Sequence, residues 1–512
     1  MKMVNSLILG SAAGLIAMSG AQAADLPVKA KAVEYVRICS LYGAGFYYIP
    51  GTDTCIKLGG YLRADVAVNT QSDFNGQYNG VGGGHNRLNN YFTTRARETL
   101  DIDTRTATEY GVVRTFANLN FSWTTGQFTN NGTTPGTTSY SGAAPVGNPS
   151  DGGIGGGSVG IYHAFIQFAG FTIGRTLSQF DAPWVNYPGN NFDGLVGGSG
   201  TVTGVNQLTY TAQFGNGVSA AVSAVDPTNY YQAGVLNLTG ASAAGMLGGA
   251  NGANNIAGTR TPNLEGMVRV DQAWGLFQLS LAAHENIPGY YGASEPTGHP
   301  SNKWGFAVQG ALSIKNIPTG PGDVLNLQAV YTDGATRYNL SSLAAVNYGM
   351  YSGTNLPGAY QSIGFANAPD VVYTGTSTAN GTGLESVTSW GFRGAFTHNW
   401  DPYWNSAVYG AYAGVRYGNL GKTVICANAT VLLGLAGTCN PDFNIVQAGI
   451  ITRWTPVKNL TFSADFAWTR LDQKYAGTVV SPLIAGPAKP AAVYELRDQD
   501  SFNFLVRAQR NW

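Results

Sequence analysis

Side chains that could catalyse a reaction or hold a metal ion are few in this chain of 512 residues. The chain contains neither Gly-x-Ser-x-Gly nor His-Glu-x-x-His, the patterns of a large class of hydrolases and of zinc proteases. Its four cysteines form two local pairs whose spacing fits no zinc motif, and no histidine lies near either pair in the sequence. We therefore expect no enzyme activity, no metal site and no cofactor. The cysteines are Cys39 with Cys55 and Cys426 with Cys439, and the five histidines are His85, His163, His284, His299 and His398.

Arginine is the other residue type with a distinctive chemistry, because its guanidinium group attracts and binds anions. Within residues 92–106, Arg95 and Arg97 take odd positions, whereas Phe92, Ala96, Leu100 and Ile102 take even positions, with Glu98 as an exception to the alternation. Arg63 and Arg114 take the polar positions of two further alternating segments. Alternation with a period of two is typical of a strand with one polar and one apolar face. The pattern predicts a basic patch on adjacent strands, although a merely solvated polar face would alternate in the same way.

The composition excludes several classes of protein. Charged residues make up 11% of the chain, against about 25% in average soluble proteins, and 70 residues are glycine. Lysine plus arginine and aspartate plus glutamate number 28 each, so the net charge gives no reason to expect nucleic acid as a partner. After residue 20 no apolar run approaches the 18 or so residues that a membrane helix needs. A helical membrane protein is therefore excluded.

The first 23 residues have the features of an export signal. Lys2 precedes an apolar run from Leu7 to Met18, and Ala21-Gln22-Ala23 is the small-x-small pattern that signal peptidase cleaves. The alternative is a first membrane helix, for which the run is short. We expect residues 1–23 to be removed and residues 24–512 to form one domain. Because export leads to an oxidising compartment, each cysteine pair is expected to form a disulfide, with free thiols as the alternative.

The rest of the chain consists of about sixteen segments that alternate apolar and polar residues, as in 56–69, 111–125 and 459–469. Such strands could also form a soluble sandwich, but here short and long connections alternate. The short ones are near 108–110, 169–170, 215–217, 273–275, 316–322, 399–402 and 455–457. The long ones are roughly 70–90, 126–158, 177–204, 226–262, 286–302, 333–385, 418–443 and 472–499. Together these features predict an all-β transmembrane antiparallel barrel with short periplasmic turns and long external loops.

Aromatic residues near strand ends support a barrel that spans the cell outer membrane several times, with both termini periplasmic. Trp390, Trp400 and Trp404 are examples, and tryptophan is favoured where an apolar wall meets lipid headgroups. The last strand, 501–512, ends on Trp512. A final strand with a terminal aromatic residue is what the outer-membrane assembly machinery commonly recognises. We therefore expect outer-membrane lipids and that machinery as partners.

A barrel of about sixteen strands encloses a water-filled channel. An arginine facing lipid at the membrane centre would cost about 2–4 kcal/mol, so the four arginines are expected to face the channel. The third long loop, 177–204, carries Asp181 and Asp193. Folded into the barrel, this loop would set two acids opposite the basic patch and form a charged constriction. The alternative is an ordinary surface loop.

Several motifs resemble those of the general diffusion porins of alpha-proteobacteria. The strongest is CSLYGAGFYYIPGTDTC (residues 39–55) followed by IKLGGYLR (56–63); the others are YGVVR (110–114), AFIQFAGF (164–171) with Gly174-Arg175, and RAQRNW (507–512). The resemblance implies a homotrimer of sixteen-stranded barrels, an inward third loop and passive diffusion of small hydrophilic solutes and ions. It also implies that Arg175 belongs to the constriction, although its parity matches that of outward residues. A bulge at Gly174 would be needed to turn it inward.

Three alternatives compete with a non-specific channel. A substrate-specific outer-membrane channel for sugars or anions would carry an aromatic track or a basic ladder along the lumen. An outer-membrane enzyme would need a catalytic constellation, which the histidines do not suggest. A closed anchor or adhesin usually has fewer strands. The residues we assign to the constriction are Arg63, Arg95, Arg97, Arg114, Arg175, Asp181 and Asp193.

Overall fold

The computed structural model describes residues 37–70, 91–124, 152–154, 157–341, 343–484 and 488–512, together with positions 76, 84 and 87. The expected signal segment, 1–23, lies outside these residues. None of the helices in the described part of the chain is both long and apolar enough to cross a membrane.

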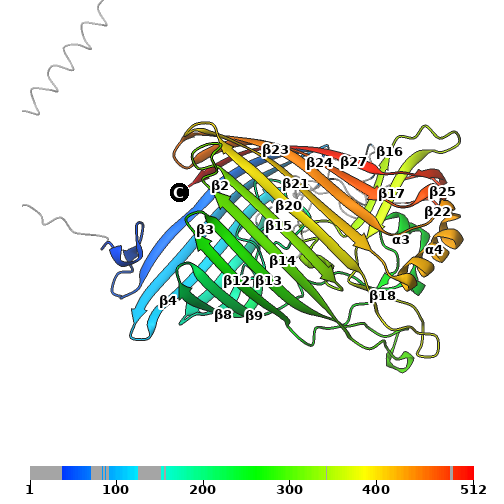
Figure 1. The fold of residues 1–512 in the computed structure, drawn as a ribbon, viewed down its shortest axis with the longest axis horizontal. Helices are drawn as coiled ribbons and strands as arrows, with labels where there is room; N and C mark the ends of the chain where they lie inside the picture. The colour runs from blue at the N-terminus through cyan, green and yellow to red at the C-terminus, as the bar shows by residue number, and fades with distance from the viewer. Residues whose placement is uncertain are drawn as a thin grey trace, which may run out of the picture.

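Sixteen antiparallel strands form a closed barrel, as predicted (Figure 1). Each strand pairs with the next barrel strand along the chain, and the last strand closes the barrel on the first through pairs such as Val66 with Val506. The strands are β2 (Cys55–Val68), β3 (Phe92–Thr108), β4 (Gly111–Thr124), β6 (Gly157–Phe168), β7 (Phe171–Thr176), β8 (Val205–Gly215), β9 (Val218–Val225), β12 (Asn263–Gln272), β13 (Gly275–Asn286), β14 (Lys303–Lys315), β15 (Val324–Asp333), β20 (Thr388–Asn399), β21 (Trp404–Arg416), β23 (Phe443–Val457), β24 (Leu460–Gln473) and β27 (Gln499–Asn511). Two short strands, β1 (Tyr47–Tyr48) and β5 (Gly152–Ile154), extend the same sheet.

The short and long connections occupy opposite ends of the barrel, which we call the turn end and the loop end. Strand boundaries leave 177–204 and 226–262 as loops, as predicted. The last short turn was predicted at 455–457 but lies at residues 458–459, because β23 continues through Pro456. A register shift between Trp454 and Val457 accommodates this proline, which has no N–H to donate to a regular ladder.

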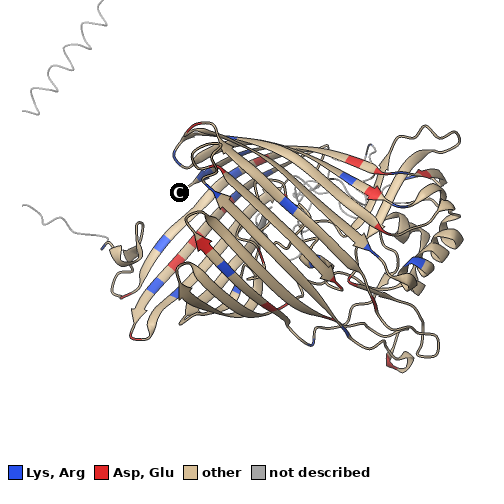
Figure 2. Cartoon of the chain, viewed as in Figure 1, with Lys and Arg blue, Asp and Glu red and all other residues tan. Residues whose placement is uncertain are grey.

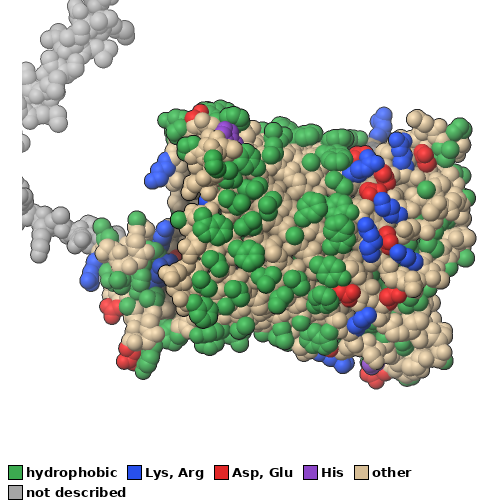
Figure 3. All heavy atoms as spheres, in the orientation of Figure 1, with side chains coloured by type: hydrophobic (Ala, Val, Ile, Leu, Met, Phe, Trp, Pro, Cys, Tyr) green, Lys and Arg blue, Asp and Glu red, His purple; other side chains and the backbone are tan. Residues whose placement is uncertain are grey.

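The outer wall is apolar and the inner wall polar, which follows from the alternation. On β14, the outward Trp304 and Phe306 are 49% and 46% exposed, whereas the inward Gln309 is buried. Figure 3 shows hydrophobic side chains across the barrel wall and charged side chains gathered toward the loop end. An apolar outer surface of this extent is what a hydrocarbon environment requires of a barrel.

The long connections build a structured cap at the loop end, which the sequence did not suggest. Its four-stranded sheet has the order β11 (Ala253–Asn254), β10 (Val235–Asn237), β18 (Val371–Tyr373), β19 (Glu385–Ser386). Its five-stranded sheet has the order β16 (Asn347–Ser352), β17 (Gln361–Asn367), β26 (Ala492–Leu496), β25 (Ala476–Ser481), β22 (Ala436–Thr438). Helices α3 (Ala243–Leu247) and α4 (Asn419–Leu433) and the short helices η3 (Leu238–Gly240), η4 (Glu295–Thr297) and η5 (Thr336–Tyr338) complete the loop-end connections.

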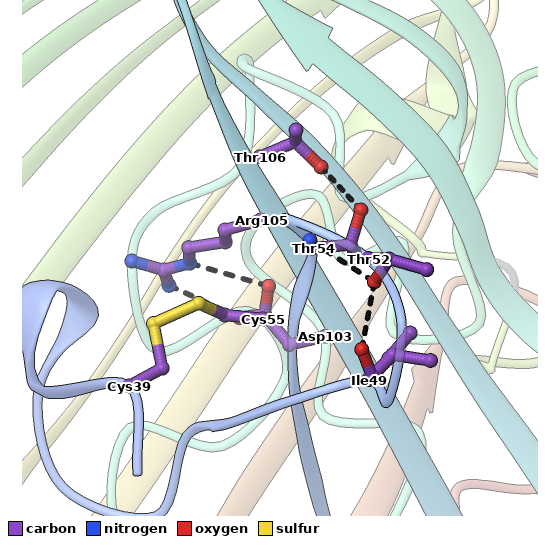
Figure 4. Close-up of a disulfide and its surroundings, with 8 residues drawn as sticks. All are labelled: Cys39, Ile49, Thr52, Thr54, Cys55, Asp103, Arg105 and Thr106. Atoms are coloured by element: carbon purple, nitrogen blue, oxygen red, sulfur yellow. Dashed lines mark hydrogen bonds and ion pairs between the residues drawn. A yellow bond between two sulfur atoms is a disulfide. The ribbon is translucent and has the colours of Figure 1, made fainter. Parts of the chain in front are cut away.

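Both cysteine pairs form disulfides, as predicted. At the turn end, Cys39 and Cys55 tie the segment with η1 (Ser40–Tyr42) and β1 to the start of β2, next to Arg105 (Figure 4). In the cap, Cys426 of α4 is bonded to Cys439, just after β22. The two disulfides therefore fasten opposite ends of the molecule.

Replacing both Cys426 and Cys439 by serine should loosen the cap and leave the barrel intact. A disulfide closing a loop of about 15 residues contributes roughly 3 kcal/mol in the chain-entropy account. We expect proteinase K to cut between α4 and β22 faster in this variant, as followed by mass spectrometry of the fragments. The matched control replaces Cys39 and Cys55, which lie at the other end; equal cutting in the two variants would contradict the prediction.

Candidate functional site

The loop 177–204 lies against the inner wall of the barrel. Side chains that point inward from consecutive strands donate hydrogen bonds to its backbone: Gln278 of β13 to the Asp181 carbonyl (2.9 Å) and Gln309 of β14 to the Phe180 carbonyl (2.7 Å). Further along the wall, the Gln447 side chain of β23 accepts a hydrogen bond from the Val196 N–H (2.9 Å). Because backbone groups need partners when water is excluded, these side chains hold the loop to the wall.

Arg393 of β20 is the central anchor of the loop. Its side chain is 1% exposed and lies under the loop. Its guanidinium donates to the carbonyls of Val185, Leu195 and Ser199, and its Nε donates to the side-chain oxygen of Gln328. One side chain thus binds three separate points of the loop backbone.

The tip of the loop crosses the lumen to the seam where the barrel closes. Phe192 packs against Ala67 of β2 and Leu505 of β27. The N–H groups of Asn191 and Phe192 donate to the carboxylate of Asp465 on β24, at 2.6 and 3.3 Å. The loop therefore starts at β7, lies against β13, β14, β20, β23 and β24, and reaches the seam of β2 and β27.

Four arginines face the loop tip from β2, β3 and β27. Arg95 and Arg507 both bind the buried carboxylate of Asp65, at 3.2 and 2.6 Å. Arg63 donates to Gln509 (2.8 Å) and stacks over Tyr61 (4.5 Å), and Arg97 donates to Ser122 (2.8 Å). Figure 2 shows positive and negative positions interspersed along β2–β4.

Asp193 is the loop acid that faces these arginines. It lies within electrostatic reach of Arg95 and Arg97 and accepts a hydrogen bond from the Tyr187 hydroxyl (2.6 Å). Burial and the neighbouring Asp193 carboxylate raise the pKa of Tyr187 well above its usual value, so this hydroxyl stays protonated and donating. The structure thus brings together Arg63, Arg95, Arg97 and Asp193 of the seven residues that we assigned to the constriction.

Asp181 does not face the lumen. It is 3% exposed, and its carboxylate accepts hydrogen bonds from the Ser199 hydroxyl and from the N–H and hydroxyl of Thr201. Burial raises the pKa of Asp181, and the hydrogen bonds from Ser199 and Thr201 oppose that shift. Its role is to join the two limbs of the loop.

Arg114 also lies apart from the cluster, and Arg175 binds the end of the loop. Arg114 is paired in register with Arg105 at the turn end and binds Asp103 (3.0 Å). Its strand places it eight residues from Ser122, the partner of Arg97, which is about 26 Å along an extended chain. Arg175 follows Gly174, which has a φ of +121°, and donates to the Thr203 carbonyl at the end of the loop. The bulge expected at Gly174 is absent, because β7 keeps a continuous register there with both β6 and β8.

Sequence reasoning missed Arg507, Arg393 and the inward glutamines. A signal for them exists, because long polar side chains occur at inward parity on one strand after another. Gln328 is the register partner of Arg393, and Ala311 lies between Gln278 and Gln328 in register. Gln447 is the register partner of Ala411. A row of this kind at one level of the wall indicates something polar lying against it.

A family model described as the porin subfamily matches residues 25–505, almost the whole chain. The chain belongs to the porin subfamily. The resemblance to alpha-proteobacterial porins is thereby confirmed. Among curated relatives of this porin, Porin Omp2a of Brucella canis is 37% identical over 227 residues, which are 43% of this chain and 55% of that protein. Porin Omp2b of the same species is 29% identical over 354 residues, 64% of this chain and 85% of that protein.

The Omp2a alignment thus spans about half the length of that relative. Among solved structures, the outer membrane channel DcaP of Acinetobacter baumannii matches with a TM-score of 0.53 at 16% identity, covering 91% of this chain and 99% of that one. This likeness shows the barrel fold.

Within the described residues, no group of three or more His, Cys, Asp or Glu side chains is placed to hold a metal ion.

Replacing Arg393 by glutamine should release the loop from the wall. Buried carbonyls of Val185, Leu195 and Ser199 would lose their donor, at about 1–3 kcal/mol for each group left unsatisfied. We expect larger and noisier single-channel currents than in the unmodified porin. The matched control is Arg105→Gln, which removes an inward guanidinium that has no described contact with the loop. Unchanged current in Arg393→Gln would show that the loop does not depend on this anchor.

Proposed function

We propose that this porin forms a water-filled channel across the outer membrane, through which small hydrophilic solutes and ions diffuse passively. The observation that carries the proposal is the loop 177–204 laid across a polar lumen, with Asp193 opposite arginines of β2, β3 and β27. This arrangement is typical of a pore that selects by size and charge. No chemical step is required.

The passage mechanism follows from the wall. Polar side chains on the inner face keep the lumen hydrated, so a solute keeps most of its water until it reaches the constriction. There, positive charges on the wall and the negative charge of Asp193 produce a field across the path. A polar or dipolar solute aligns with this field, whereas an apolar solute has to disturb ordered water and is slowed.

The proposal includes assembly as a homotrimer and an orientation of the barrel in the membrane, with its turn end in the periplasm. Family membership supports self-association, and both ends of the barrel sheet, at β2 and β27, lie at the turn end, which we assign to the periplasm (Figure 1). Trp512 exchanges backbone hydrogen bonds with Gly60, so the last residue is still part of the β2–β27 seam. Recognition of this final strand by the outer-membrane assembly machinery is part of the same proposal.

The purified protein in a planar lipid bilayer tests the proposal directly. We expect stable current steps that close in groups of three, with a conductance that rises linearly with bulk salt. Block by one sugar at low concentration would instead favour a channel specific for that solute. A well-folded, heat-modifiable protein that gives no conductance would overturn the proposed function.

A further inference from the structure

Six arginines of β2, β3, β4 and β27 occur in three pairs, and in two of these pairs both arginines bind the same aspartate. Arg95 and Arg507 bind the two carboxylate oxygens of Asp65, at 3.2 and 2.6 Å. Near the turn end, Arg105 and Arg114 both bind Asp103 at 3.0 Å. In each case one buried or half-buried carboxylate offsets the repulsion between two guanidinium groups.

The third pair, Arg63 and Arg97, has no such carboxylate. These residues are direct register partners on β2 and β3, and like charges directly opposite each other destabilise a sheet. In the described part of the chain, neither forms an ion pair within 4.0 Å. Arg63 donates to the amide oxygen of Gln509, and Arg97 donates to the hydroxyls of Ser122 and Tyr61, so neither has a carboxylate as its hydrogen-bond acceptor.

Tyrosines frame this pair. Arg63 stacks over the ring of Tyr61 at 4.5 Å, and Arg97 lies over the ring of Tyr162 at 5.5 Å. Ring faces of this kind hold a guanidinium in place without neutralising its charge. Each Nε is used in a wall contact, which directs the outer edges of the two guanidiniums away from those contacts. Both side chains are half-buried, unlike the buried Arg95 and Arg507.

The nearest acids do not supply the missing partner. Asp65 already receives hydrogen bonds on both oxygens from Arg95 and Arg507. Asp193, on the loop, interacts electrostatically with Arg97 but binds the Tyr187 hydroxyl instead of forming a salt bridge. The four arginines of the constriction thus outnumber its two carboxylates.

We propose that Arg63 and Arg97 form a binding station for small oxyanions, carboxylates or phosphates, which take the place that Asp65 and Asp103 hold in the other two pairs. The proposal rests on the diffusion channel proposed above and names the solute class that its constriction favours. An oxyanion has two or more acceptor oxygens, which match the planar forks of two guanidiniums. Anions then pass preferentially, and a multivalent one is retained long enough to obstruct the current.

The test uses the full protein in a planar bilayer with dilute potassium chloride and added inorganic phosphate. The unmodified porin should be anion-selective in a salt gradient, and phosphate should reduce its chloride current in a saturable way. In Arg63→Gln/Arg97→Gln, the phosphate concentration for half block should rise by about tenfold or more, as expected for loss of charged hydrogen bonds. The matched control, Arg105→Gln/Arg114→Gln, removes two charges from a pair that already has its aspartate and should keep the block.

Equal phosphate block in the unmodified porin and in Arg63→Gln/Arg97→Gln would overturn the binding station. An equal loss of phosphate block in both double variants would also overturn it, because the block would then depend only on the total charge of the lumen. Steady conductance without phosphate block would also overturn it while leaving the proposed channel standing, whereas absence of any conductance would refute the channel itself. If the glutamine variant does not fold, Arg63→Lys/Arg97→Lys keeps the charge. That variant should remain anion-selective but lose most of the phosphate block, because lysine has no bidentate fork.

Discussion

The buried guanidinium of Arg393 is the interaction on which the constriction depends. A charge that is 1% exposed is costly unless its donors are satisfied, and here the loop backbone satisfies them. The loop depends on Arg393 in turn, because the loop has no strand pairing to the wall and its carbonyls need the donors of this guanidinium. With Arg393 in place, Phe192 reaches the seam and Asp193 faces the arginines.

The barrel was predictable because alternation and connection length are local properties of the sequence. Residues 177–204 could be bounded at both ends, and the inward direction of Arg63, Arg95 and Arg97 followed from parity. Parity does not show how far along the barrel axis a residue lies, because that position depends on the register with the neighbouring strand. Arg114 has the expected direction but lies beside Arg105 at the turn end, far from Arg97.

Two further features were beyond the reach of sequence patterns. The choice between Asp181 and Asp193 depends on how the loop folds on itself, and Asp181 bonds to Ser199 and Thr201 inside it. The cap is built from strands of two to seven residues that pair with segments far away in the chain, such as β10 with β18. Strands this short carry too little periodicity to be recognised.

The seam between β2 and β27 sets an order of events during folding. Asp65 belongs to the first barrel strand, whereas Arg507 belongs to the last, so their ion pair joins residues 442 positions apart. Phe192 likewise needs both strands, through Ala67 and Leu505. The constriction can therefore be completed only after the C-terminal strand has closed the barrel. A partly assembled chain would have an open lumen without its charge filter, so a complete constriction marks a barrel whose wall has already closed.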